Sequence, residues 1–162
     1  MDTKPVLPAL DPRTVPARKS TGYPTEAFRA MVAGRGKQAL GDALGLANFG
    51  VNLVRLEPGA YSSLRHWHTR QDEFVWILEG EITLITDQGE QVLGPGTCAG
   101  FAAGVANGHH LTNRTSRPAV YLEVGDRLPG DGANYPDPNV DLQVRSTRSG
   151  YQYQHKDGRP YE

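Results

Sequence analysis

Residues 59–80 read GAYSSLRHWHTRQDEFVWILEG and hold the most informative pattern in the chain. His66 and His68 are two positions apart, and because side chains alternate along a β-strand, both imidazoles fall on one face of an extended segment. Glu73 follows a short polar turn and opens an apolar run, so a carboxylate stands at the start of a strand beside the two histidines. His109 offers a further imidazole from a distant segment. We predict that these four side chains form a metal site built on strands.

The donor set narrows the choice of metal without identifying it. Three neutral imidazoles and one carboxylate suit a divalent first-row ion, and Fe, Mn, Ni, Co and Zn all remain open. Four protein ligands in an octahedron leave two adjacent positions for water, substrate or dioxygen, which is typical of a reactive ion rather than a structural one. We therefore expect one divalent transition metal as the cofactor.

Both segments resemble the paired motifs of the cupin superfamily. The first motif is matched, with one extra residue before the histidines, by Gly59, His66, His68, Glu73 and Gly80. The second is matched by Gly96, Gly104, His109 and Asn113. It departs from the usual pattern in two ways. Ala102 stands where a proline is usual, and four residues rather than two separate Gly104 from His109. The resemblance implies the metal ligands His66, His68, Glu73 and His109, a fold of the all-β class, and a small bacterial cupin without an assigned reaction.

The expected architecture is a single cupin barrel, an RmlC-like double-stranded β-helix of jelly-roll type, over residues 47–125. Residues 1–46 are rich in proline and predict an extended N-terminal arm with a short helix at 25–33. Residues 126–162 turn polar and predict a C-terminal loop and tail, packed outside the barrel, with a last strand at 151–155. Short apolar runs between glycine turns predict barrel strands at 49–56, 74–78, 82–86, 91–93, 97–101, 109–113 and 119–124.

Alternation along residues 74–78 makes a prediction about partners. If Glu73 points inward, Val75 and Ile77 share its face, and the outer face carries Phe74, Trp76 and Leu78. An apolar stripe of this kind needs a cover, which the arm, the tail or a second subunit can supply. Because cupins are commonly dimers, we expect a homodimer.

The remaining candidate residues have simpler interpretations. We expect His110 to face outward at the surface or in an interface, Cys98 to be a small packing residue, and Asn113 to bond the backbone. An apolar lumen lined by Val75, Ile77 and Leu111 favours a small organic ligand or substrate. Candidates to hold its acidic or carbonyl group are Arg55, Arg65, Tyr61 and Tyr121.

Composition excludes several classes of function. The chain has 162 residues, typical of one domain, and a formal charge of −1 from 17 basic and 18 acidic side chains, so nothing favours nucleic-acid binding. One cysteine cannot form an internal disulfide, and no stretch has the features of a signal peptide or a membrane helix. We expect a cytoplasmic protein with no membrane partner.

Three classes of function remain open: a metal-dependent enzyme, a binding module and a metal-free barrel. With Fe(II), the site suits a dioxygenase; with another divalent ion, it suits a Lewis-acid lyase or isomerase. Alternatively, the barrel is a non-catalytic module that binds a metal or a small ligand. A metal-free barrel resembling sugar-phosphate epimerases is the weakest alternative, because the clustered histidines and Glu73 have no role in it.

Overall fold

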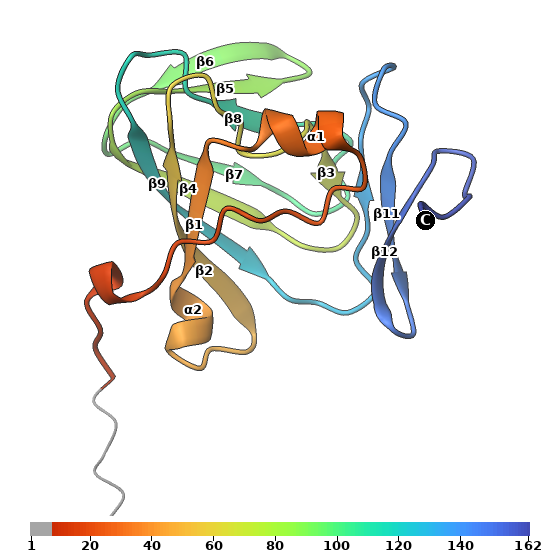
Figure 1. Cartoon of the computed structure of the whole chain (residues 1–162), viewed down its shortest axis with the longest axis horizontal. Helices are drawn as coiled ribbons and strands as arrows, with labels where there is room; N and C mark the ends of the chain where they lie inside the picture. The colour runs from red at the N-terminus through yellow and green to blue at the C-terminus, as the bar shows by residue number, and fades with distance from the viewer. Residues whose placement is uncertain (1–7) are drawn as a thin grey trace, which may run out of the picture.

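A computed structural model describes residues 8–162 and confirms the all-β class. The strands form three antiparallel sheets (Figure 1). The largest has the order β1-β2-β9-β4-β7. Its strands are β1 (Arg35–Ala39), β2 (Phe49–Leu56), β9 (Ala119–Asp126), β4 (Glu73–Glu79) and β7 (Cys98–Phe101). The second sheet, in the order β6-β5-β8, comprises β6 (Gly89–Leu93), β5 (Ile82–Thr86) and β8 (His110–Thr112).

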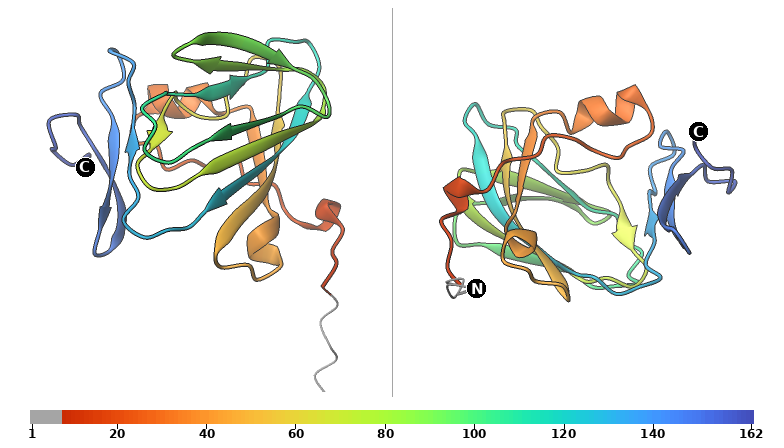
Figure 2. Two further views of the ribbon diagram at one scale, coloured as in Figure 1. Left: turned by 180° about the vertical axis from the view of Figure 1, so that it is seen from behind. Right: turned by 60° about the horizontal axis from the view of Figure 1, so that its bottom comes forward.

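The third sheet lies at the flank of the molecule and has the order β12-β11-β10-β3 (Figure 2). Its strands are β12 (Gly150–Gln154), β11 (Gln143–Thr147), β10 (Ala133–Asn134) and β3 (Trp67–His68). Helices are few and short: η1 (Pro12–Thr14), α1 (Glu26–Met31) and α2 (Leu40–Ala43). Thr25 caps α1 by accepting a hydrogen bond from the backbone N–H of Phe28, the usual N-cap contact.

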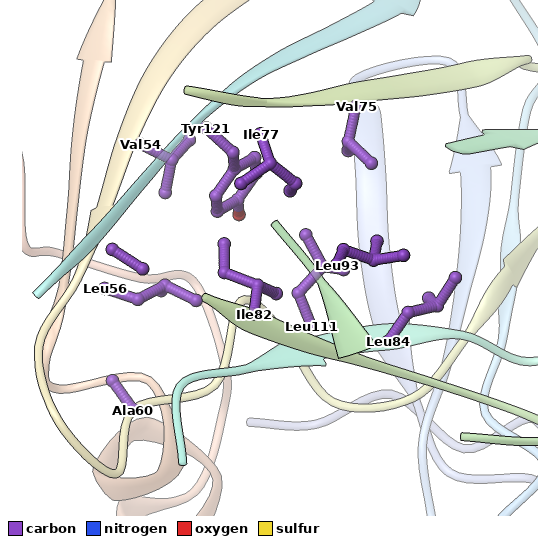
Figure 3. Close-up of a cluster of buried hydrophobic side chains, with 11 residues drawn as sticks. Val54, Leu56, Ala60, Val75, Ile77, Ile82, Leu84, Leu93, Leu111 and Tyr121 are labelled. Atoms are coloured by element: carbon purple, nitrogen blue, oxygen red, sulfur yellow. The ribbon is translucent and has the colours of Figure 1, made fainter. Parts of the chain in front are cut away.

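The main core lies between the five-stranded sheet and the three-stranded sheet (Figure 3). Its buried members include Val54, Leu56, Val75, Ile77, Ile82, Leu84, Leu93, Leu111 and Tyr121. The alternation predicted for β4 is confirmed, since Val75 and Ile77 are buried whereas Trp76 is 46% exposed. A second core joins the N-terminal segment to the third sheet and contains Tyr23, Val32, Leu64, Ala133, Tyr135, Val140 and Leu142.

The segments on either side of the barrel are more ordered than the sequence indicated. Residues 35–39, expected in the arm, form β1, which pairs with β2 along its whole length. Residues 133–147, expected as loop, supply β10 and β11. Both regions are polar, so they lack the apolar runs from which strands are predicted. Strand β1 lies at the edge of the sheet and takes its hydrogen bonds from β2. The side chains of Arg35 and Lys37 on β1 line the pocket described below.

The turn between β4 and β5 depends on one glycine. Gly80 has a φ of +75°, in the left-handed region that L side chains rarely adopt. A Cβ at this position would lie 2.9 Å from the carbonyl oxygen of Pro118 and 3.0 Å from Ala119. Glycine therefore allows the start of β9 to approach this turn closely.

Candidate metal centre and its pocket

His66, His68 and Glu73 form a compact cluster of possible metal ligands. His66 Nε2 lies 3.2 Å from His68 Nε2, and His68 Nε2 lies 3.5 Å from Glu73 Oε1. The distance from His66 Nε2 to Glu73 Oε2 is 3.8 Å. One donor atom from each side chain lies within 4.8 Å of the other two. Two imidazoles and a carboxylate that converge in this way can share one divalent ion.

His109 lies beside this cluster and touches it through Glu73. Its Nε2 is 2.7 Å from Glu73 Oε2, and its ring stacks on Phe101 with 3.6 Å between centroids. The backbones of His109 and His66 exchange two hydrogen bonds, of 2.9 and 3.1 Å. All four side chains predicted from the sequence therefore lie together. His109 contacts the carboxylate of Glu73 and lies outside the compact group of His66, His68 and Glu73.

Three parts of the fold meet at this point. Glu73 begins β4 in the largest sheet, where it lies opposite Phe101 on one side and Gly125 on the other. His68 lies on β3, which pairs with β10 of the third sheet. His66 and His109 are joined by an isolated bridge just before β8 of the second sheet. The cluster is therefore fixed by pairings between segments that are distant in sequence.

Electrostatics prepare the cluster for a cation. Burial lowers the pKa of His66 to about 4, so its imidazole is neutral and has a free lone pair. Burial also disfavours protonated His68, but Glu73 and Asp131 outweigh it and raise the pKa of His68 to about 9. Although burial opposes ionisation of Glu73, His109 and His68 hold its pKa well below the ordinary value. An ion bound here would displace the His68 proton, as metal uptake by histidines requires.

Asp131 is a site residue that sequence reasoning missed. It is 3% exposed, and its Oδ2 lies 2.6 Å from His68 Nδ1. Its Oδ1 accepts hydrogen bonds from the backbone N–H groups of Arg70 and Gln71. A buried carboxylate behind a ligating histidine fixes the ring and its tautomer. Asp131 lies between two glycines in a polar loop, so no periodic signal distinguishes it in the sequence.

The cluster borders a pocket of about 350 Å³. Metal-cluster and apolar residues form one part of its wall: His66, His68, Glu73, His109, Val75, Phe101 and Leu111. Tyrosines from the N-terminal segment and the third sheet form another part: Tyr23, Tyr135, Tyr151 and Tyr153. A smaller cavity of about 230 Å³ reaches the same His68, Glu73 and His109 and is lined also by Trp67 and Val105. The cluster can therefore be approached from two cavities.

Charged groups from β1 and β9 also line the larger pocket. Lys37 Nζ donates to Glu123 Oε1 over 2.8 Å, and Asn52 donates to the same oxygen over 3.0 Å. Arg35 lines the pocket with Lys37, because alternate residues of β1 face inward. The sequence did not predict that β1 lines the pocket, because β1 is polar. The spacing of Arg35 and Lys37 nevertheless has the period of a strand.

Of the four residues expected to hold an acidic or carbonyl group, only Tyr121 lines this pocket. Arg55 is exposed and paired with Glu57. Arg65 is held by Asp87 and Asp137, so its charge is already paired. Tyr61 packs against His110, with 5.0 Å between their ring centroids.

Two expectations about single residues were wrong and one is confirmed. His110 is buried at 8% exposure, because residues 60–63 cover the outer side of β8. Burial lowers the pKa of His110 below its ordinary value. Cys98 is exposed at the start of β7 and is not a packing residue. Asn113 is fully buried and donates to the backbone carbonyls of Leu56 and Arg117, as expected.

Comparison with known proteins agrees with this fold. A family model described as a cupin domain matches residues 52–125. A crystal structure of a sugar phosphate isomerase from a cupin superfamily of Silicibacter pomeroyi is 48% identical, with a TM-score of 0.89 over 96% of this chain and 97% of that one. The chain belongs to the cupin superfamily.

More distant similarity supports the fold alone. The polyketide cyclase RemF from Streptomyces resistomycificus is 18% identical, with a TM-score of 0.62 over 75% of this chain and 80% of that one. No curated protein sequence matches the chain. Among residues 8–162, no helix is both long and apolar enough to span a membrane.

Proposed function

We propose that this cupin is a metal-dependent isomerase that interconverts a small hydroxy-aldehyde and a hydroxy-ketone. The observation that carries the proposal is a single pocket bordered by both the His66, His68 and Glu73 cluster and a carboxylate suited to proton transfer, Glu123. The 48% identical Silicibacter pomeroyi protein is described as a sugar phosphate isomerase, which supports the same reaction class.

Glu123 has the placement that a general base needs. It faces Val75 across the β4–β9 pairing, so Glu73 is its diagonal neighbour, with the two Cα atoms about 7 to 8 Å apart. Its Oε1 accepts from Lys37 and Asn52, whereas its Oε2 accepts no hydrogen bond from residues 8–162. The side chain is thus held in place while one oxygen remains available to a ligand in the pocket.

An isomerisation needs only the groups named here. Glu123 takes the proton from the carbon beside the substrate carbonyl and returns it to the former carbonyl carbon, while the hydroxyl proton passes to the former carbonyl oxygen, so atoms and charge balance without a co-reactant. A divalent metal held by His66, His68, Glu73 and His109 supplies Lewis-acid stabilisation of the charge that develops on the carbonyl oxygen. Val75, Phe101 and Leu111 form an apolar wall that limits access of water to the reacting carbons.

Solvent isotope exchange tests this proposal. The metal-loaded protein is incubated in D2O with a panel of three- to six-carbon aldoses and ketoses and their phosphates, and deuterium at the carbon beside the carbonyl is followed by NMR. We expect exchange with the wild type and a loss of about 100-fold or more in Glu123→Gln, with metal content unchanged. Glu57→Gln, at an exposed position outside the pocket, is the control.

Two results would contradict the proposal. Exchange that persists in Glu123→Gln removes Glu123 as the base. No exchange with any member of the panel, in protein that carries its metal, favours the alternative in which the barrel only binds a small ligand.

The pocket beside the cluster argues against a purely structural ion, because Val144, Tyr151 and Tyr153 of the tail line this pocket without filling it.

A further inference from the structure

Arg35 has an unusual position for an arginine in this molecule. Its Nη1 donates to the backbone carbonyl of Ser62 over 2.5 Å. No carboxylate of residues 8–162 pairs with it, in contrast to Arg65, whose charge is balanced by two aspartates. A guanidinium has five N–H donors, so most of those on Arg35 remain available to the pocket that it lines.

Tyr121 belongs to the wall of the same pocket, and its hydroxyl lies just behind the pocket surface. Its side chain is fully buried, and its hydroxyl is one of two buried side-chain polar atoms in the described residues that lack a hydrogen-bond partner. Figure 3 shows this oxygen pointing from β9 into the interior. An unpaired buried hydroxyl destabilises the fold, so an unpaired group at a pocket wall calls for an explanation.

Arg35 and Tyr121 act on the same region of the pocket. Both side chains belong to the wall of the one pocket. Ser62 lies beside both groups, because its carbonyl accepts from Arg35 and its side chain lies near the Tyr121 hydroxyl without the geometry of a hydrogen bond.

This region is also close to the metal cluster. Ser63 follows Ser62 directly, and its Oγ lies 3.3 Å from His66 Nδ1. Consecutive Cα atoms are about 3.8 Å apart. The Ser62 carbonyl that accepts from Arg35 is therefore one residue away from Ser63, which contacts the candidate ligand His66. A small molecule in the pocket can therefore reach both groups.

We propose that Arg35 and Tyr121 form an oxyanion site, so that the ligand of this pocket is a small molecule with a carboxylate or phosphate at one end and its carbonyl at the metal cluster. The guanidinium binds two oxygens of the anion in parallel, as arginine does with both groups. The Tyr121 hydroxyl donates to the same anion and thereby gains the partner that it lacks. Lys37 does not compete for the anion, because Glu123 pairs with it. This inference deepens the proposed function by naming a substrate class.

Calorimetric titration with three probes of similar size tests the inference. D-glycerate carries a carboxylate, glycerol 3-phosphate carries a phosphate, and glycerol is the neutral control. Each is titrated into the full-length protein, both as purified and after metal removal, in a buffer without carboxylate or phosphate. We expect at least one anion to bind the wild type at least ten-fold more tightly than glycerol, and the preferred anion identifies the charged group.

Four variants separate the oxyanion site from folding and from surface charge. Arg35→Gln should lose ten-fold or more in affinity for the preferred anion. Arg35→Lys should have an intermediate affinity, because it keeps the positive charge but lacks the two parallel N–H donors of a guanidinium. Tyr121→Phe should lose about three- to ten-fold while its melting temperature is unchanged or higher, since an unpaired hydroxyl is removed. Arg55→Gln changes an exposed arginine outside the pocket and should bind like the wild type.

The outcomes distinguish this inference from the proposed function. If Arg35→Gln binds both anions as tightly as the wild type, or if no anion binds better than glycerol, the oxyanion site is wrong even when isotope exchange is observed. If the anion preference and its loss in Arg35→Gln persist in a protein that holds no metal and catalyses no exchange, the oxyanion site stands and the isomerase proposal fails.

Discussion

His109 and His110 are adjacent in sequence, but their environments differ. His109 contacts Glu73 through Nε2, whereas His110 points to the other side of the chain, where its Nδ1 lies 3.1 Å from the Ser63 carbonyl oxygen. Of the two, His109 is the one that contacts the metal cluster, even though both side chains are buried.

We predict that His109→Ala weakens metal affinity by at least ten-fold, because a ligand is removed. His110→Ala should leave affinity nearly unchanged and cost about 1 to 3 kcal/mol of stability, because it removes a buried ring packed against Tyr61. His66→Ala serves as the positive control and should lose most of the metal. Metal titrations with thermal unfolding of each variant measure both quantities.

Loss of affinity confined to His110→Ala would show that the direction of the side chains in this segment is wrong. A wild-type protein that binds none of Fe, Mn, Ni, Co or Zn would contradict the metal site as a whole.

The sequence predicted the four clustered side chains but not the groups around them. His66, His68 and Glu73 could be predicted because their spacing has a physical meaning on strands. Asp131 and Arg35 could not be predicted. Each lies in a polar segment, and only the folding of that segment against the rest of the molecule brings the residue to the site. The burial of His110 was missed for the same reason, since its cover comes from residues 60–63.

At the scale of elements, predictability depended on burial. Strands β2 and β5 lie at the predicted positions, and β4 extends the predicted run by one residue at each end. These strands contribute inward-facing apolar residues to the main core. By contrast, β1 and β11 are half-buried and polar, so their pairing partners rather than their own composition determine them.

The turn before β5 offers a test of element packing. We predict that Gly80→Ala destabilises the protein by about 2 kcal/mol or more, because left-handed backbone strain of about 1 to 2 kcal/mol adds to a clash with the backbone of Pro118. Gly59→Ala is a matched control with a φ of +79° and no atom within 4 Å of the added Cβ. It should lose only the strain component.

Chemical denaturation of the two variants side by side measures the difference. Equal losses of stability would mean that the close approach of β9 to this turn costs nothing, and that only the backbone angle matters at Gly80.

At the scale of the whole molecule, an apolar stripe crosses the outer face of the largest sheet. Register places Phe74 beside Val124, which pairs in turn with Val51, and Trp76 beside Leu122, which pairs in turn with Leu53. Phe74, Trp76 and Leu78 are 36%, 46% and 43% exposed, so neither the described arm nor the tail covers them fully. We propose that a second copy covers this face in a symmetric dimer, since a stripe of this kind is self-complementary.

Trp76→Glu tests that arrangement. The substitution places a charge in the proposed interface, and we expect the mass in solution, measured by light scattering, to fall from dimer to monomer. Val92→Glu adds the same charge at another exposed apolar position, on β6, and should leave the dimer intact. A monomeric wild type at micromolar concentration, or a Trp76→Glu variant that remains dimeric, would refute the proposed interface.

The meeting of three sheets at the metal cluster also has a consequence for the order of folding and metal binding. His68 lies on β3, which pairs with β10, and it contacts Asp131, 63 positions further along the chain. Contacts between segments so far apart form only after a long loop has closed. We therefore expect the protein to bind its ion after the barrel has folded, and not to use the ion as a nucleus for folding.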